Sequence, residues 1–478
     1  MADRRRQRGP LADRKAAVHG RDHVRVLFVS AEADPFSKVG GLADVAAALP
    51  AELAAMGHDV RVITPCHASA MDVFRAADDR QFLQVPDFAG MRTVELATVP
   101  GHGGVPVTLV HQPHYFGRPG VYGDPDDLLR YRFFCRVVGT ALREKAWIPE
   151  ILHLNDWHTA PLAFALRNFA WSHPALRGTA SVLTIHNLRY RGPDDFNDYL
   201  AQGIYYSDFV TTVSPAYARE ILSPESGEGL DRLLRLRGDS LVGILNGLSF
   251  AAYDPATDTR IAARFGARTI DNRASNTGAL RAAAGLEPAA GPLLGMVTRL
   301  TEQKGIDLVI EAAPAMIARG AELVVLGQGD DALATALRAL EATYPGRVRL
   351  VDDFDEGLAR RIYAGSDMFL MPSRFEPCGL GQLIAMRYGS IPIGRRTGGL
   401  ADTIVDPQEN AENATGFLFD DFAPGALLAA FERARAAFDD LPLWRQLQAN
   451  GMQADMSWGP SAKRYVEVYE RALRQRGA

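Results

Sequence analysis

The chain has 478 residues, of which 47% are hydrophobic and 23% are charged, and its net charge is −5 at pH 7. This length predicts two domains, each able to bury a core of its own. The charge balance gives no reason to expect nucleic acid or a membrane surface as a partner. The three cysteines, Cys66, Cys135 and Cys378, are too far apart for a metal site or a disulfide framework, which favours a reducing compartment.

Residues 1–21 are basic and contain no apolar stretch. A secretory signal or a membrane span needs an apolar core, so this segment fits neither. We expect a disordered basic arm. An organelle transit peptide is the alternative, although the two aspartates of the segment argue against it.

Six apolar runs in the first half of the chain have the length and composition of buried strands. They lie at 24–30, 60–64, 105–110, 151–155, 181–185 and 209–213. Helical patterns separate several of them, and this alternation predicts a parallel, doubly wound sheet. We assign residues 22–250 to this N-terminal domain.

A second series of apolar runs predicts another α/β sheet of the same Rossmann-like kind in a C-terminal domain over residues 291–455. These runs lie at 293–297, 323–326, 348–351, 368–371 and 391–393. Between the two domains, residues 251–290 have weak apolar periodicity and form the predicted linker region. Residues 456–478 predict a terminal helix.

A glycine-containing loop, SKVGGLADV, follows the first predicted strand. Gly40 and Gly41 allow the backbone to approach a ligand closely, and the helix that starts near Leu42 directs its positive end to the same place. Lys38 adds a charge suited to phosphate. A tight strand-to-helix turn with a solvated lysine would give the same pattern.

Arg299 and Lys304 lie at the end of the strand at 293–297 and the start of the following helix. Both could therefore reach one bound anion, the arginine as a two-pronged donor and the lysine as a compact charge. Two solvated surface cations are the alternative.

An acid and a glycine turn follow the last two predicted strands. A helical pattern at 380–388 joins these strands, so they should be parallel, and Glu376 and Thr397-Gly398-Gly399 should meet at the same edge of the sheet. Backbone N–H groups of the glycine pair could face a phosphate at the start of a helix. The pattern indicates chemistry on a phosphorylated ligand, the alternative being an ordinary turn and a surface acid.

Three sequence blocks together resemble the bacterial glycogen synthase and plant starch synthase family of retaining glycosyltransferases. They are KVGGLADV, SRFEPCGL and RRTGGLADT, and the similarity extends from about Val24 to Tyr469. The resemblance implies the GT-B architecture, in which two Rossmann-like domains face each other across a cleft and the C-terminal helix crosses back to the N-terminal domain.

The resemblance also implies roles for individual residues. Glu376 would orient the transferred sugar and stabilise its positive charge, His186 would bond that sugar, and Asp156 would face the acceptor. His186 could instead be a hydrogen-bonded structural residue. Phe354 would stack on the nucleobase or be a core aromatic. The residues that the resemblance places around the donor are Lys38, Gly40, Gly41, Asn246, Arg299, Lys304, Phe354, Cys378, Gly379, Leu380, Thr397, Gly398 and Gly399.

Several positions depart from the family pattern. Val39 replaces the usual Thr. Ile384 stands where many related retaining enzymes have a second acid, and an apolar residue at this position is typical of glycogen synthases. Residues 191–204 are shorter than usual and lack a Lys, with Ala201 or Gln202 in its place, and Ser249 replaces an Asp. These last segments border the acceptor side.

We therefore predict a cytoplasmic glucosyltransferase that moves glucose from ADP-glucose, with retention, to the non-reducing 4-hydroxyl of an α-1,4-glucan such as glycogen. Neither a metal nor another cofactor is expected. The alternatives are a related enzyme with a different small acceptor and a non-catalytic protein that binds glucan or nucleotide. UDP-glucose is also compatible with the sequence, as is any oligomeric state.

Overall fold

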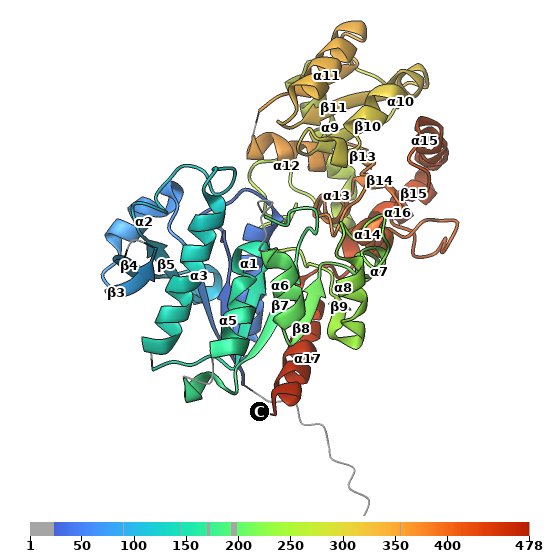
Figure 1. Cartoon of the computed structure of the whole chain (residues 1–478). Helices are drawn as coiled ribbons and strands as arrows, with labels where there is room; N and C mark the ends of the chain where they lie inside the picture. Colours follow the sequence, from blue (N-terminus) through green and yellow to red (C-terminus); the bar gives the residue numbers. More distant parts are fainter. Residues whose placement is uncertain are drawn as a thin grey trace, which may run out of the picture.

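The computed structural model describes residues 23–88, 90–144, 146–169, 173–192, 198–353 and 355–477. The predicted basic arm and Phe354 lie outside these ranges. The chain forms two α/β units, each built on its own sheet, with the second unit lying above the first in Figure 1.

The first unit contains a sheet that has nine strands in the described part of the chain, in the order β3-β4-β5-β2-β1-β6-β7-β8-β9. All six predicted strands of the N-terminal domain occur in it. The strands are β1 (Arg25–Val29), β2 (Asp59–Pro65), β3 (Arg80–Asp87), β4 (Gly90–Pro100), β5 (Pro106–His111), β6 (Ile151–Asn155), β7 (Ala180–Ile185), β8 (Phe209–Thr212) and β9 (Leu241–Gly243).

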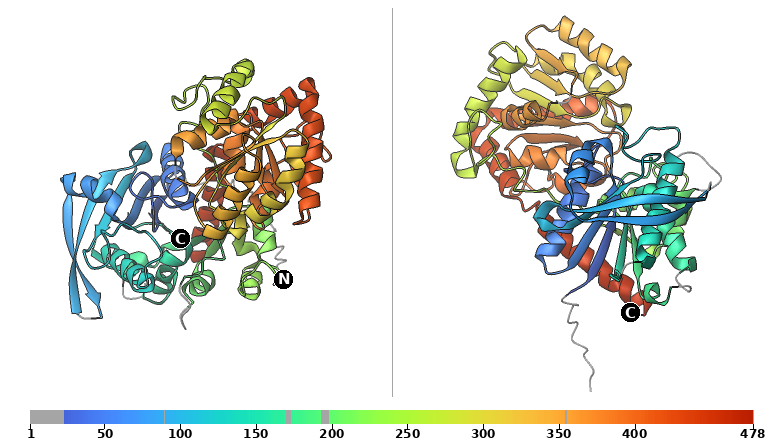
Figure 2. Two further views of the ribbon diagram at one scale, coloured as in Figure 1. Left: turned by 90° about the horizontal axis from the view of Figure 1, so that it is seen from above. Right: turned by 90° about the vertical axis from the view of Figure 1, so that its left-hand side faces the viewer.

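Strands β3 and β4 are an antiparallel addition to this otherwise parallel sheet. They form a long ribbon at the edge of the first unit, away from the second unit (Figure 2). The sequence did not predict them, because neither strand has a continuous buried run. Most residues of β3 are exposed, and the buried positions of β4 are interrupted by half-buried ones.

The second unit contains a sheet with the order β12-β11-β10-β13-β14-β15, and its neighbouring strands are parallel throughout. The parallel pair predicted around Glu376 is β13 and β14. The two parallel-rich sheets confirm the predicted fold class. The strands are β10 (Leu293–Val297), β11 (Glu322–Leu326), β12 (Val348–Val351), β13 (Met368–Met371), β14 (Ile391–Arg395) and β15 (Phe417–Phe419).

Helices cover both faces of the first sheet, as the side chains of β1 show. Leu27 and Val29 belong to one hydrophobic cluster, and Val26 and Phe28 belong to another on the opposite face. Both faces are buried, which is why the strands of this sheet appear in the sequence as continuous apolar runs. Among the described residues, no helix combines the length and apolar character needed to cross a membrane.

The α-helices connect the strands or pack on the sheets. In chain order they are α1 (Gly41–Ala55), α2 (Met71–Ala76), α3 (Asp127–Glu144), α4 (Asp156–Thr159), α5 (Pro161–Phe169), α6 (Tyr199–Tyr206), α7 (Pro215–Glu220), α8 (Asp231–Arg235), α9 (Arg273–Ala284), α10 (Ile306–Ala318), α11 (Asp331–Thr343), α12 (Glu356–Gly365), α13 (Gly381–Arg387), α14 (Gly398–Thr403), α15 (Pro424–Asp439), α16 (Leu441–Gln453) and α17 (Trp458–Arg476).

Helix α9 lies within the predicted linker region. Its Leu280 belongs to a hydrophobic cluster of the second unit, together with Phe369 of β13. Arg273 and Asn276, on the same buried face, are polar, which explains why the sequence shows so little apolar periodicity here.

The chain passes between the two units twice, and the two crossings run side by side. Leu248 N donates to Met456 O at 2.7 Å, and Leu248 forms a parallel bridge with Ser457. A Cβ atom on Gly247 would lie 2.5 Å from Trp458 Cα, so the close approach requires glycine. After the second crossing, α17 packs on the first sheet, where Tyr469 is fully buried (Figure 1).

Candidate active site

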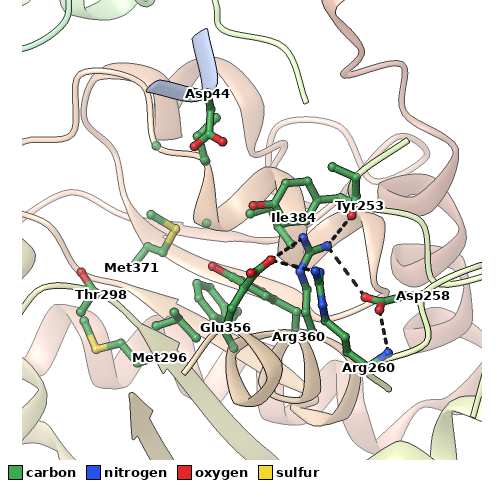
Figure 3. Close-up of a pocket in the computed structure, with 18 of the residues that line it drawn as sticks. Asp44, Tyr253, Asp258, Arg260, Met296, Thr298, Glu356, Arg360, Met371 and Ile384 are labelled. Carbon is green, nitrogen blue, oxygen red and sulfur yellow. Dashed lines mark hydrogen bonds and ion pairs between the residues drawn. The ribbon is translucent and has the colours of Figure 1, made fainter. Parts of the chain in front are cut away.

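A cavity of about 880 Å³ lies between the two units, and residues of both line it. Lys38 and Asp44 come from the first unit, and Lys304 and Glu376 come from the second. Figure 3 shows Asp44 on one side of the cavity and residues of α12 on the other. The cavity therefore brings together the glycine-loop lysine and the acid that the sequence singled out.

Glu376 lies in the loop after β13 and is paired with Lys304. Its Oε2 atom accepts from Lys304 Nζ at 2.5 Å and from Ser373 Oγ at 2.9 Å. The side chain of Glu376 is 6% exposed and that of Lys304 is 17% exposed. A carboxylate and a cation thus lie next to each other at the cavity wall, with little water around the carboxylate.

Gly305 explains how the loops after β10 and β13 come so close. It has a φ of +69°, and a Cβ atom there would lie only 2.1 Å from Pro372 O. Glycine adopts this left-handed conformation without strain and leaves room for the neighbouring backbone. The residue immediately before it, Lys304, is thereby placed beside the Glu376 loop.

Arg299 is oriented differently from Lys304. It is exposed, and its Nη1 atom lies 3.3 Å from Tyr190 Oη of the first unit. Of Arg299 and Lys304, which the sequence predicts to bind one anion, only Lys304 is among the described residues that line the cavity. The role of Arg299 stays a prediction.

The glycine loop has internal anionic partners that the sequence analysis missed. Lys38 Nζ donates to Asp44 Oδ1 at 2.5 Å, and Val39 N donates to Glu32 Oε2 at 2.5 Å. Burial raises the pKa of Glu32 to about 7, although backbone hydrogen bonds act in the opposite direction. A Cβ atom on Gly41 would lie 3.6 Å from Leu380 Cδ1, so the loop faces the motif of the second unit.

Asp156 and His186 meet at the ends of neighbouring strands β6 and β7. His186 N donates to Asp156 Oδ1 at 2.7 Å, and His186 Nε2 lies 2.9 Å from Asn155 Oδ1. Asp156 has a φ of +54°, which is uncommon for a residue other than glycine. Burial raises the pKa of Asp156 to about 7 and lowers the pKa of His186 to about 3, because it disfavours the charged form of each.

The turn Thr397-Gly398-Gly399 opens helix α14, as predicted, but its donors already have an anionic partner. Gly398 N donates to Glu220 Oε1 at 2.7 Å, and Thr397 Oγ1 lies 3.2 Å from both carboxylate oxygens of Glu220. Glu220 belongs to α7 of the first unit. In this structure the position predicted for a phosphate at this turn is therefore occupied by the carboxylate of Glu220.

Of the remaining predicted residues, three line one of two cavities, and Gly40 and Cys378 line neither. Gly379 and Leu380 line the cavity that contains Glu376. Asn246 instead lines a second cavity of about 550 Å³ beside the two crossings. Cys378 is buried, and burial raises the pKa of its thiol to about 12, which fits a packing residue better than a nucleophile.

Comparisons with known proteins agree with this arrangement. The family description "Starch synthase catalytic domain" matches residues 25–236, and "Glycosyl transferases group 1" matches residues 291–436. The glycogen synthase of Syntrophotalea carbinolica is 42% identical, over 94% of this chain and 99% of its own length. The chain belongs to the glycogen synthase and starch synthase family of glycosyltransferases.

Other members of the family are similar over the same extent. The glycogen synthase of Moorella thermoacetica is 40% identical, over 95% of this chain and 98% of its own length. The catalytic domain of starch synthase IV from Arabidopsis thaliana, solved with bound ADP and acarbose, has a TM-score of 0.84 and 33% identity, covering 95% of this chain and 100% of that one. The family predicted from the three sequence blocks is confirmed.

One wall of the cavity in this glycosyltransferase comes from residues that the sequence analysis assigned to the linker. Arg360 of α12 stacks on Tyr253 at 3.8 Å and lies 3.8 Å from Asp258 (Figure 3). Arg260 pairs with Glu356 at 3.0 Å. Tyr253, Asp258 and Arg260 follow no period and belong to no motif, so no pattern in the sequence predicts their place in the cavity wall.

Proposed function

We propose that this chain is a glycogen synthase that transfers glucose from ADP-glucose, with retention, to the non-reducing 4-hydroxyl of an α-1,4-glucan. The observation that carries the proposal is the Lys304–Glu376 pair at the wall of the interunit cavity. The glycogen synthases among its relatives and the starch synthase that binds ADP support this substrate assignment. We place the reaction in the cytoplasm.

The pair provides the two charges that such a transfer needs. When the bond between glucose and diphosphate breaks, negative charge grows on the diphosphate and positive charge grows on the sugar. Lys304 is placed to stabilise the first charge, and Glu376 to stabilise the second. Because both charges are fixed before the reaction, little reorganisation is needed as the bond breaks.

Retention fits a reaction on one face of the sugar. The diphosphate leaves, an oxocarbenium-like sugar forms, and the acceptor hydroxyl attacks from the side that the diphosphate has left. The departing phosphate takes the proton of that hydroxyl. In this scheme Glu376 orients and stabilises the sugar without forming a covalent bond to it.

His186 takes part as a neutral imidazole. Its pKa of about 3, lowered by burial, leaves it uncharged at neutral pH. It can therefore exchange hydrogen bonds with a sugar hydroxyl but adds no positive charge beside the developing cation. Asp156, which accepts from His186 N, lies toward the acceptor in this proposal.

Closure of the two units would complete the site. Lys38 reaches the cavity from the first unit but is held by Asp44 at 2.5 Å, and Arg299 lies outside it. A bound diphosphate would offer Lys38 an anionic partner in place of Asp44 and Arg299 one in place of the Tyr190 hydroxyl. Closure around the donor would also exclude water that would hydrolyse it.

The test is incorporation of radiolabelled glucose into glycogen from ADP-glucose and, separately, from UDP-glucose. Glu376→Ala is the test variant, and Glu225→Ala, which changes an exposed glutamate, is the matched control. We expect incorporation from ADP-glucose that Glu225→Ala retains and Glu376→Ala loses by orders of magnitude. Near-normal turnover of Glu376→Ala would refute the role of this residue. Transfer to maltose or glucose but not to glycogen would identify a different acceptor.

A further inference from the structure

Helices α7 and α14 form a contact between the two units in which each helix supplies an acid to the start of the other. Glu220, at the end of α7, accepts from Gly398 N at 2.7 Å. Asp402 of α14 accepts from Ala216 N, at the start of α7, at 2.7 Å. The two helices therefore contact each other and run antiparallel, and Figure 1 shows both at the junction of the units.

The Gly398-Gly399 turn also lies directly against the backbone of Glu376. Gly399 N donates to Glu376 O at 3.0 Å. A Cβ atom on Gly398 would lie 2.0 Å from Glu376 O, and one on Gly399 would lie 2.0 Å from Cys378 O. The turn and the Glu376 loop are therefore in backbone contact, and a shift of the turn must move that loop.

These contacts connect a side chain of the first unit to the acid in the active site of the second. Glu220 holds Thr397 and Gly398, and the next residue, Gly399, holds the carbonyl group of Glu376. The carboxylate of Glu376 is then oriented by Lys304 and Ser373. Bonds between a carboxylate and backbone or hydroxyl donors are among the stronger hydrogen bonds in proteins.

We propose that Glu220 is a positioning residue that fixes the backbone of Glu376 through the Gly398-Gly399 turn. The inference rests on the proposed function, because it concerns the same reaction. It assigns the first unit a part in setting the geometry of the catalytic acid. Glu220 itself does not touch the reacting atoms.

The test compares kcat and the KM for ADP-glucose in Glu220→Ala, Glu220→Gln and Asp402→Ala, with glycogen at saturation. Glu220→Ala should lower kcat about tenfold or more and change KM by less than about twofold, because the misplaced Glu376 is needed mainly in the transition state. Glu220→Gln should keep most of the activity, since its amide oxygen can still accept from Gly398 N. Asp402→Ala weakens the same contact at its other end and should have the smaller effect.

Hydrogen exchange of residues 374–380 and 397–400 gives a readout that does not depend on activity. Glu220→Ala should accelerate exchange in both segments, and Glu220→Gln should restore protection. This measurement tests the link even if the wild-type enzyme shows no transfer from ADP-glucose, which would refute the proposed function instead.

Several results would overturn the proposal. A fall in KM with unchanged kcat would mean that Glu220 competes with the donor phosphates for the turn. Lower thermal stability with normal kcat per folded molecule would mean a purely structural contact. Equal losses of kcat in Glu220→Ala and Asp402→Ala would assign the effect to the general contact between the units.

Discussion

Lys304→Met tests whether the ion pair between Lys304 and Glu376 stabilises the folded protein as well as serving the reaction. The substitution leaves a carboxylate that is 6% exposed, with Ser373 Oγ as its other described donor. Removing one partner of a buried ion pair typically costs about 3–5 kcal/mol, because the other charge is left unpaired. Since Lys304 is itself 17% exposed and the site opens into a cavity, we expect a loss of about 3 kcal/mol.

The measurement is equilibrium urea denaturation of the wild type, Lys304→Met, Glu376→Gln and the double variant, followed by circular dichroism. Glu376→Gln removes the buried charge, so the double variant should recover about 2 kcal/mol of the loss seen in Lys304→Met. All three variants should have low activity, whatever their stability. The reasoning is refuted if Lys304→Met is as stable as the wild type, or if the double variant is no more stable than Lys304→Met.

Three further predictions concern other parts of the structure. Asp156→Asn should reduce the pH dependence of the free energy of unfolding. Burial raises the pKa of the Asp156 carboxyl to about 7, above its value in the unfolded chain. The stabilisation that this carboxyl provides when protonated is therefore fully present below about pH 4 and is lost as the pH rises through about 7. Between pH 5 and pH 8 the wild type should lose on the order of 2 kcal/mol more unfolding free energy than Asp156→Asn, as measured by denaturation at each pH. An equal loss in the two proteins would contradict this. Gly247→Ala should lower the free energy of unfolding by about 2 kcal/mol, because its Cβ atom would lie 2.5 Å from Trp458 Cα. The control is Gly278→Ala, at a position of helix α9 where a Cβ atom would have nothing within 4 Å; in thermal denaturation it should be as stable as the wild type or more stable. Arg299→Ala should raise the KM for ADP-glucose and leave stability unchanged, because the side chain is exposed; an unchanged KM would remove it from the donor site.

The strands that the sequence predicted are those whose residues are buried on both faces. Residues 151–155 and 368–371 are buried at every position, and their apolar runs were sufficient to identify them. Strand β3 is mostly exposed, while β9 and β15 have only three residues each. Neither a half-exposed strand nor a very short one produces a run that stands out from its surroundings.

The positions of the active-site motifs were predictable for a topological reason. Parallel strands end at the same edge of a sheet, so a motif that follows β10 must lie near one that follows β13. Applied to the sequence, this rule predicts that Glu376 meets the Thr397-Gly398-Gly399 turn; the pairing of β10 with β13, which brings Lys304 to Glu376, is known from the structure. The rule could not identify Glu220 as the partner of Gly398, because the two are 178 residues apart and belong to different units. Such a pairing depends on how the units dock, and no local pattern in the sequence records it.

Helix α17 determines the order in which the two units can finish folding during synthesis. Tyr465 and Tyr469 are fully buried in the first unit, and Tyr469 Oη lies 2.7 Å from His153 Nδ1. The first unit therefore cannot complete its core until α17 has left the ribosome, whereas the second unit is continuous in the chain between the two crossings. The half that is translated first is then the last to be finished, and until that moment the surface of its sheet on which the tyrosines pack stays open to solvent.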